Sequence, residues 1–168
     1  MDASQYSDSA TLRDGSAVTI RAQRPTDREG MGSALRQMGE ESVQRRFFAP
    51  RRYFSEREVK FFLDIDFVQQ VALLAVAGDA IVGGGRYIVT EPGVAEVAFS
   101  VADDWQGRGL GGRLMEHLIA IARQQGLRQL VAEVLAENTP MLAVFRKSGL
   151  PMATRRDGGV VHATLALT

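Results

Sequence analysis

The stretch with the clearest chemical signature is a glycine-rich run, Gln106-Gly107-Arg108-Gly109-Leu110-Gly111-Gly112. An apolar, strand-like run at residues 94–101 precedes it, and residues 114–125 follow it with helical periodicity. Glycines let a backbone approach a ligand closely, and the first turn of a helix exposes unpaired N–H groups that carry partial positive charge. The pattern therefore predicts that backbone N–H groups of residues 106–112 bind a diphosphate. Arg108 and Arg113 either add charge near that phosphate or lie on the solvated surface.

Three kinds of phosphate-binding loop are candidates for this run. A P-loop requires Gly-Lys-Ser/Thr, which Gly112-Arg113-Leu114 does not provide. A dinucleotide-binding loop requires an alternation of strands and helices, with an acidic residue about twenty positions later. Glu133 lies near that distance, but three strands precede the loop as a meander. The third pattern, Gln/Arg-x-x-Gly-x-Gly/Ala, is satisfied by Gln106, Gly109 and Gly111.

The composition limits the remaining classes of function. The chain has 168 residues and a formal net charge of zero, so we expect no general electrostatic attraction to nucleic acid or to an anionic membrane. It has no apolar run long enough to span a bilayer and no signal-peptide pattern, and a cytoplasmic location is expected. The absence of cysteine excludes disulfides and thiolate ligands. Two isolated histidines, His117 and His162, are both expected to be exposed, and no metal site is predicted.

The order of predicted elements indicates an α+β domain with a mixed sheet. A hairpin around Asp14-Gly15 is followed by helices that begin near Pro25 and Ser55, with a short helix between them at 40–48. Strands are predicted at 71–77, 80–90, 94–101 and 127–135, and three glycines inside the second of them suggest a bulge or a close approach by another segment. A helix capped by Asn138 and a closing hairpin at 152–167 complete the chain. Residues 1–9 are expected to be a flexible tail, and residues 10–168 a single domain.

At residues 12–150 the chain resembles the GNAT superfamily of N-acetyltransferases, and within it the acetyltransferase domain of bacterial protein lysine acetyltransferases that act on acyl-CoA synthetases. The resemblance is carried by Leu12-Arg-Asp-Gly15 with Val18-Thr-Ile-Arg21, Arg46-Phe-Phe48, Ala95-Glu96-Val97, the run from Val101 to Gly111, Ala136-Glu-Asn138 with Met141-Leu142, and Lys147-x-Gly149. It implies the GNAT fold, a mixed and mostly antiparallel twisted sheet with flanking helices. It also implies acetyl-CoA as the donor and an amine as the acceptor.

The resemblance implies a role for several residues around the glycine run. The diphosphate of coenzyme A would lie on residues Gln106 to Gly112. In this superfamily the central strand and the next one separate at a bulge, and the pantetheine arm lies between them. Phe99 and Val101 are the positions whose main chain would face it, and an N–H there would polarise the thioester carbonyl. Asn138 matches a residue whose side chain touches the pantetheine arm, a role that is compatible with helix capping.

A carboxylate is needed because an amine with a pKa near ~10.4 is mostly protonated at neutral pH. Glu96 is the candidate general base, since it lies in an otherwise apolar strand where burial raises a carboxyl pKa. Related lysine acetyltransferases place a catalytic glutamate at this strand position. The alternative is that Glu96 points to water from a half-exposed face. Glu133 is the rival base, and Asp103 and Asp104 are expected to cap or line the loop.

One position departs from the superfamily pattern. Many members use a tyrosine to protonate the leaving thiolate, and here that position is Phe145, which has no proton to donate. Either water protonates the thiolate or it leaves unprotonated, and Phe145 would then be a packing wall for the coenzyme. The basic and aromatic run at 45–54 is interpreted as a solvated helix end, with a nucleic-acid surface and a border of the acceptor cleft as alternatives.

The resulting hypothesis is an acetyl-CoA-dependent N-acetyltransferase that works by direct transfer, with a protein lysine, for example of an acyl-CoA synthetase, as the acceptor. A small amine or a protein N-terminus is the alternative acceptor. A non-catalytic acyl-CoA-binding regulatory module is the alternative class. The large regulatory domains found in some related proteins have no counterpart in these 168 residues, so their regulation is not carried over. The sequence gives no signal for an oligomeric state.

Overall fold

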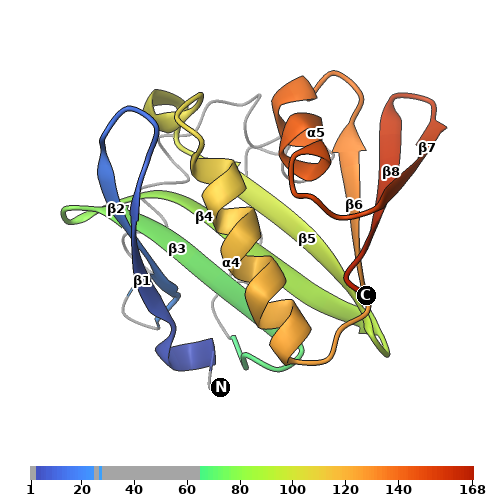
Figure 1. Cartoon of the computed structure of the whole chain (residues 1–168), viewed down its shortest axis with the longest axis horizontal. Helices are drawn as coiled ribbons and strands as arrows, with labels where there is room; N and C mark the ends of the chain where they lie inside the picture. The colour runs from blue at the N-terminus through green and yellow to red at the C-terminus, as the bar shows by residue number, and fades with distance from the viewer. Residues whose placement is uncertain (1–2, 25–26, 28–64) are drawn as a thin grey trace.

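The computed structural model describes residues 3–24, 27 and 65–168 (Figure 1). The helices predicted at 40–48 and from Ser55 fall outside the described residues, and so does the run at 45–54. Of the helix predicted near Pro25, only Asp27 is described. The carboxylate of Asp27 accepts hydrogen bonds from both Arg21 Nη atoms, at 2.9 and 2.8 Å, and from the Arg24 backbone N–H at 2.6 Å. These bonds fix the chain where it leaves the first hairpin.

In the part of the chain that the structure describes, eight strands form one sheet in the order β1-β2-β3-β4-β5-β6-β8-β7. Every neighbouring pair is antiparallel except β5 and β6, which are parallel. The predicted α+β class with a mixed, mostly antiparallel sheet is therefore confirmed. The strands are β1 (Ser7–Thr11), β2 (Ala17–Ala22), β3 (Gln70–Ala77), β4 (Ala80–Glu91), β5 (Val94–Val101), β6 (Gln129–Leu135), β7 (Met152–Asp157) and β8 (Val160–Ala166).

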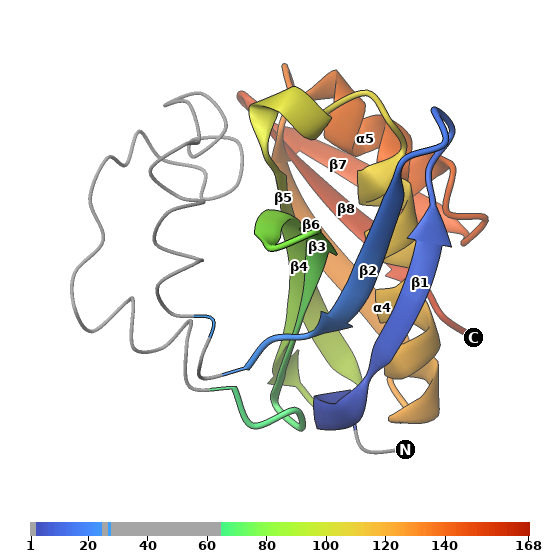
Figure 2. The same cartoon turned by 90° about the vertical axis from the view of Figure 1, so that its left-hand side faces the viewer.

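Among the described residues, two α-helices lie on the same side of the sheet (Figure 2). α4 (Leu110–Gln124) crosses β3, β4 and β5 and buries an apolar face that includes Leu114 and Leu118, whereas α5 (Thr139–Arg146) lies beside its first turns. Gly126, with φ at +80°, ends α4 as predicted, because Leu127 N–H bonds back to Ala122 O at 3.0 Å. Among the described residues, no helix is long and apolar enough to cross a bilayer.

Two of the three glycines of β4, Gly83 and Gly85, allow α4 to approach the sheet closely. A Cβ at Gly85 would lie 2.8 Å from the ring of Phe99 and 3.1 Å from Leu118, and one at Gly83 would lie 3.1 Å from Leu110. The β3–β4 register also shifts beside them, between Ala75 and Val76. Both the close approach and the irregularity expected from these glycines are present.

The N-terminal segment is more ordered than the sequence indicates. A 3-10 helix, η1 (Ala3–Gln5), precedes β1, which already begins at Ser7 inside the stretch expected to be a tail. β1 is an edge strand with mostly exposed side chains, so it lacks the apolar alternation that signals a strand. His117, predicted to be exposed, is half-buried: the Tyr6 hydroxyl bonds to its Nδ1, and the two rings meet edge to face.

Candidate active site

The parallel strands β5 and β6 separate directly after Glu96. Their pairing covers residues 94–96 with 129–131, whereas β5 continues to Val101 and β6 to Leu135 without further pairs (Figure 1). The expected bulge on β5 is not found there, because the β4–β5 register is regular from residue 95 to 101 and shifts instead between Val89 and Glu91. Phe145 on α5 lies against Phe99 on β5, in the part of β5 that no longer pairs with β6.

Some backbone groups of β5 point into the gap between β5 and β6. Ala102 N–H bonds to Val82 O on β4 at 2.8 Å. Because residues of an antiparallel ladder alternate in direction, Ser100 and Ala98 also bond to β4, while the N–H and C=O of Phe99 and Val101 are directed away from it. The Gln106 side-chain amide donates to Val101 O at 3.2 Å. The Val101 N–H and both backbone groups of Phe99 are thus directed into the gap between β5 and β6, where an extended chain would pair with them.

The glycine loop presents an open helix N-terminus. Gly109 is the N-cap of α4 with φ at 87°, no side chain caps the helix, and its first turn has no acidic residue. Nothing lies within 4 Å of where a Cβ would stand on Gly107 or Gly112. Uncapped N–H groups beside open space fit a diphosphate, and so do the glycines that leave room for it. A 3-10 helix, η3 (Asp103–Trp105), joins β5 to this loop, and Asp104 in it is exposed.

The two arginines of the loop region are directed to the β1–β2 hairpin. Arg108 Nη1 lies 3.4 Å from Ser16 Oγ and 3.5 Å from an Asp14 carboxylate oxygen, and its guanidinium lies 4.4 Å from the centroid of the Trp105 ring. Arg113 Nη2 donates to Thr11 O at 3.3 Å. Both side chains therefore have protein partners, which favours a structural role for them over direct phosphate contact.

Glu96 stands at the point where the strands separate. Its neighbours Ala95 and Val97 face the core beneath α4, so Glu96 lies on the opposite face of the sheet, where it is half-buried. Burial raises the pKa of the Glu96 carboxyl, and the negative charge of Glu133 raises it further. This is the environment expected for a carboxylate that accepts a proton near neutral pH.

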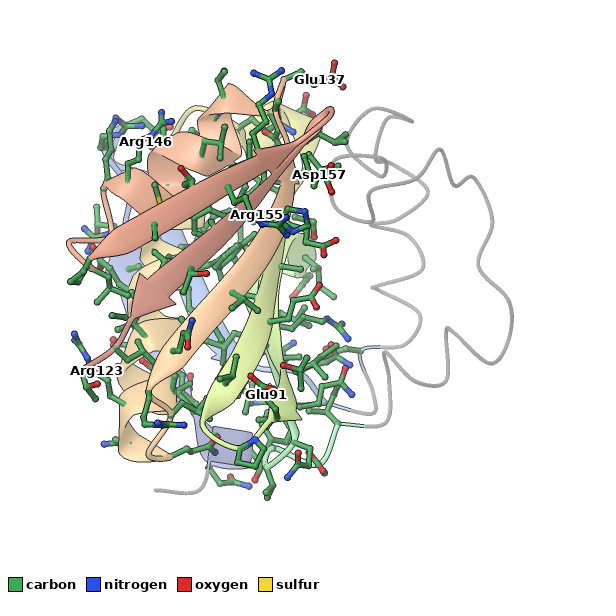
Figure 3. All side chains as sticks on the ribbon, turned by 90° about the vertical axis from the view of Figure 1, so that its right-hand side faces the viewer. Glu91, Arg123, Glu137, Arg146, Arg155 and Asp157 are labelled. Atoms are coloured by element: carbon green, nitrogen blue, oxygen red, sulfur yellow. The ribbon has the colours of Figure 1, made fainter. Side chains whose placement is uncertain are left out.

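Glu133, the rival base, is more exposed and has a partner. Its carboxylate lies 3.5 Å from His162 Nδ1 on β8, with half of its side chain accessible. His162 was predicted to point outward, and it lies on the face of the sheet opposite the core, together with Glu96 and Glu133, where it is half-buried. Arg155 is opposite His162 on β7, and Figure 3 shows it on the side away from α4 and α5.

Asn138 and Phe145 hold α5 in place. Asn138 is the predicted N-cap, since its Oδ1 accepts from Met141 N–H at 3.3 Å, and it is 4% exposed. Phe145 is 1% exposed, and its ring centroid lies 6.0 Å from that of Phe99. It is therefore part of the apolar wall beside the separated strands. Val144 lies 3.2 Å from where a Cβ would stand on Gly111, so this glycine also lets α5 contact the first turn of α4.

Two further arginines near the site were not identified from the sequence. Arg86 on β4 is 6% exposed and donates to Gln70 Oε1 at 3.0 Å and to Gln23 Oε1 at 3.3 Å. A charged residue inside an otherwise apolar strand was the signal for it. Arg13 in the hairpin turn donates to Gly107 O at 3.2 Å. No local pattern reveals a contact between residues so far apart along the chain.

Other parts of the described chain add little to this site. A cavity of about 450 Å³ lies near η1 and the segment before β3, at the opposite end of the sheet from the glycine loop (Figure 1). It contains none of the residues predicted to act. Within the described residues, no three His, Cys, Asp or Glu side chains are grouped so that they could hold a metal ion.

Comparison with known proteins gives consistent matches over most of the chain. The model of the acetyltransferase (GNAT) family matches residues 36–150. An acetyltransferase of Pseudomonas aeruginosa is 35% identical over 136 residues, which are 78% of this chain and 73% of that protein. The acetyltransferase Pat of Mycolicibacterium smegmatis is 29% identical over 89% of this chain but only 46% of its own length. The crystal structure of the GNAT domain of S. lividans PAT superposes with a TM-score of 0.88 at 36% identity, covering 95% of this chain and 96% of that domain.

Proposed function

Because the chain belongs to the acetyltransferase (GNAT) family, and is thus an N-acetyltransferase that uses acetyl-CoA, we propose that Glu96 is its general base and that a protein lysine is its acceptor. The observation that carries the proposal is the position of Glu96. It is half-buried at the point where β5 and β6 separate, with its pKa raised by burial and by Glu133.

The backbone of the loop and of β5 would hold the coenzyme. N–H groups of residues 106–112 bind the diphosphate, and the main chain of Phe99 and Val101 pairs with the pantetheine arm beside Asn138. Bound acetyl-CoA supplies an acetyl group on a thioester, whose sulfur is a competent leaving group. The N–H groups of Phe99 and Val101, which β4 does not use, are the donors that this chain offers to the thioester oxygen, and that of Phe99 is nearer to Glu96 along the strand.

Glu96 would take the proton from the acceptor ammonium, directly or through water. The freed amine then forms the N–C bond while the C–S bond breaks, and the electron pair leaves with the sulfur. The nitrogen, which is cationic once the N–C bond has formed, releases its second proton to water to give the neutral amide. Phe145 has no proton to donate, so the thiolate leaves as such or is protonated by water. The ring of Phe145 instead forms part of the apolar wall with Phe99.

The lysine acceptor is supported by the Pat-type relatives. Glu96 and Glu133 place two carboxylates near the point where β5 and β6 separate, and His162 and Arg155 lie farther along the same face of the sheet. An acyl-CoA synthetase in the cytoplasm is the target that the resemblance to lysine acetyltransferases suggests. Since the chain spans about half the length of Pat, any activity of that whole protein is a proposal for this chain.

Release of free thiol from acetyl-CoA tests the proposal. Lysine peptides from an acyl-CoA synthetase, peptide N-termini and small amines serve as acceptors for the wild type, for Glu96→Gln and for a control, Glu91→Gln, whose parent glutamate is exposed at the end of β4 (Figure 3). We expect Glu96→Gln to lower kcat by about 10²–10⁴-fold without weakening coenzyme A binding, as loss of a general base does. The control should keep full turnover. Undiminished turnover of Glu96→Gln would refute the base assignment, and turnover only with small amines would refute the lysine acceptor.

A further inference from the structure

Two turns that are far apart in the sequence meet at the coenzyme loop. The turn between β1 and β2, residues 12–16, lies beside the glycine loop at one end of the sheet (Figures 1 and 2). From this turn, Arg13 Nη2 donates to Gly107 O at 3.2 Å. Arg13 Nε also lies 3.1 Å from where a Cβ would stand on Gly109. The guanidinium is thus in contact with two of the loop glycines.

An arginine of the loop, Arg108, contacts the same turn. Arg108 contacts Ser16 Oγ at 3.4 Å and Asp14 at 3.5 Å while it covers Trp105. Hydrogen bonds from Ser16 and the charge of Arg108 hold the pKa of the Asp14 carboxyl below its usual value, so it is ionised at neutral pH. Together Arg13 and Arg108 form a reciprocal arginine clamp, in which each turn supplies one cation to the other.

A clamp matters here because a glycine-rich loop is costly to order. Gly107 and Gly109 both have positive φ values, 79° and 87°, and glycine loses more conformational freedom on ordering than any other residue. A donor fixed on the Gly107 carbonyl restrains the orientation of the peptide that follows it. A loop that is ordered before the ligand arrives binds more tightly, because less entropy is lost on binding.

We propose that Arg13 is a positioning residue of the coenzyme site, which holds the glycine loop in its binding shape from the β1–β2 turn without touching the coenzyme. The inference rests on the assignment of residues 106–112 to the diphosphate. Arg13 acts on affinity, not on the acetyl-transfer step, because within the described part of the chain it contacts Gly107 and Gly109 of the loop and no residue of the face that carries Glu96.

Titration of the full chain with coenzyme A tests this without requiring turnover. We expect Arg13→Ala to raise the Kd for coenzyme A and the KM for acetyl-CoA by about tenfold, with kcat at saturation within about twofold, as for the loss of one charged hydrogen bond. Arg13→Lys should restore part of the affinity, because an ammonium still donates to the carbonyl. The control is Arg123→Ala, which removes a bond from α4 to Leu167 O (3.2 Å) and should lower the melting temperature without changing the Kd.

A second titration, with dephospho-coenzyme A, shows whether Arg13 positions the loop or contacts the 3′-phosphate of the coenzyme. If Arg13 only positions the loop, Arg13→Ala weakens both ligands by the same factor. If the variant loses its discrimination between the two, Arg13 contacts the 3′-phosphate and the proposal is wrong. An unchanged Kd for coenzyme A would also overturn it. Failure of every amine as an acceptor would refute the proposed function alone, since coenzyme binding would still report on the clamp.

Discussion

Glu96 on β5 and Glu133 on β6 lie on the same face of the sheet, and the charge of Glu133 adds to burial in raising the pKa of the Glu96 carboxyl. Their strands pair only up to Glu96, so the two carboxylates stand where β5 and β6 begin to separate. Glu133 itself has a second neighbour, His162, at 3.5 Å. Burial is the larger cause of the raised Glu96 pKa, and Glu133 adds to it, so under the proposed function Glu133 modulates the pH at which Glu96 becomes a base.

Glu133→Gln should therefore move the acidic limb of the kcat/KM profile to lower pH. Removal of the neighbouring negative charge lowers the pKa of Glu96, so a larger fraction of it is ionised at a given acidic pH. The pH dependence of thiol release at low acetyl-CoA and acceptor concentrations measures the limb. Glu137→Gln is the control, because Glu137 is exposed beyond β6 (Figure 3). A limb that stays in place in Glu133→Gln would show that burial alone raises this pKa.

Gly85→Ala should destabilise the fold through the contact between α4 and the sheet. The new Cβ would lie 2.8 Å from Phe99 and 3.1 Å from Leu118, closer than packed atoms tolerate. Forcing these side chains apart costs about 1–3 kcal/mol in the free energy of unfolding, measured by urea denaturation. Gly159→Ala is the matched control, since nothing lies within 4 Å of its Cβ position. Equal stability of the two variants would mean that the helix shifts freely over β4.

How much could be predicted from the sequence depends on whether the determining contacts are local. The strand at 94–101 was predicted with its observed bounds, because alternation and the flanking turns are local signals. Helix α4 was predicted to begin at Leu114 but begins at Leu110. Glycines disfavour a helix on their own, yet here Gly111 lies in the first turn of α4, where a Cβ would stand 3.2 Å from Val144 of α5.

The site was predictable where the resemblance supplied a register and not where distant segments meet. Glu96 was identified because a charged residue interrupts an apolar strand. By contrast, the contact of Arg13 with Gly107 joins residues 94 positions apart, and the pairing of Glu133 with His162 depends on β8 inserting between β6 and β7. Neither has a local pattern, since both follow from the order of strands in the sheet.

Asp27→Asn should weaken the fold at neutral pH but not in acid. Burial acts to raise the pKa of Asp27, but the hydrogen bonds from Arg21 and Arg24 outweigh it, so the pKa lies below its usual value. A carboxyl whose pKa is lowered on folding contributes stability above its unfolded pKa and loses it as the pH falls through the folded value. We expect a deficit of about 1.5–3 kcal/mol at pH 7, the range for hydrogen bonds to a charged group.

Urea denaturation of the wild type and Asp27→Asn across a pH series measures this difference. The two stabilities should converge as the pH falls below the usual range of an aspartate, because the wild-type carboxyl is then protonated as well. Asp79→Asn, in the exposed β3–β4 turn, should show no such convergence. A deficit that is independent of pH would mean that the Arg21–Asp27 pair does not stabilise the fold through its charge.

Asn138→Asp separates the two roles of Asn138. Aspartate keeps the acceptor that caps α5 at Met141 N–H, and its charge suits a helix N-terminus, which offsets part of the cost of burying a carboxylate at a position that is 4% exposed. The melting temperature should therefore fall less than in Asn138→Ala. It lacks the amide N–H donors that the pantetheine arm would use, so the KM for acetyl-CoA should rise by about 3–10-fold, as for one lost hydrogen bond. Asn138→Ala should lose the cap as well, at a cost of about 0.5–2 kcal/mol. If Asn138→Asp keeps the wild-type KM, Asn138 is a helix cap and does not contact the coenzyme.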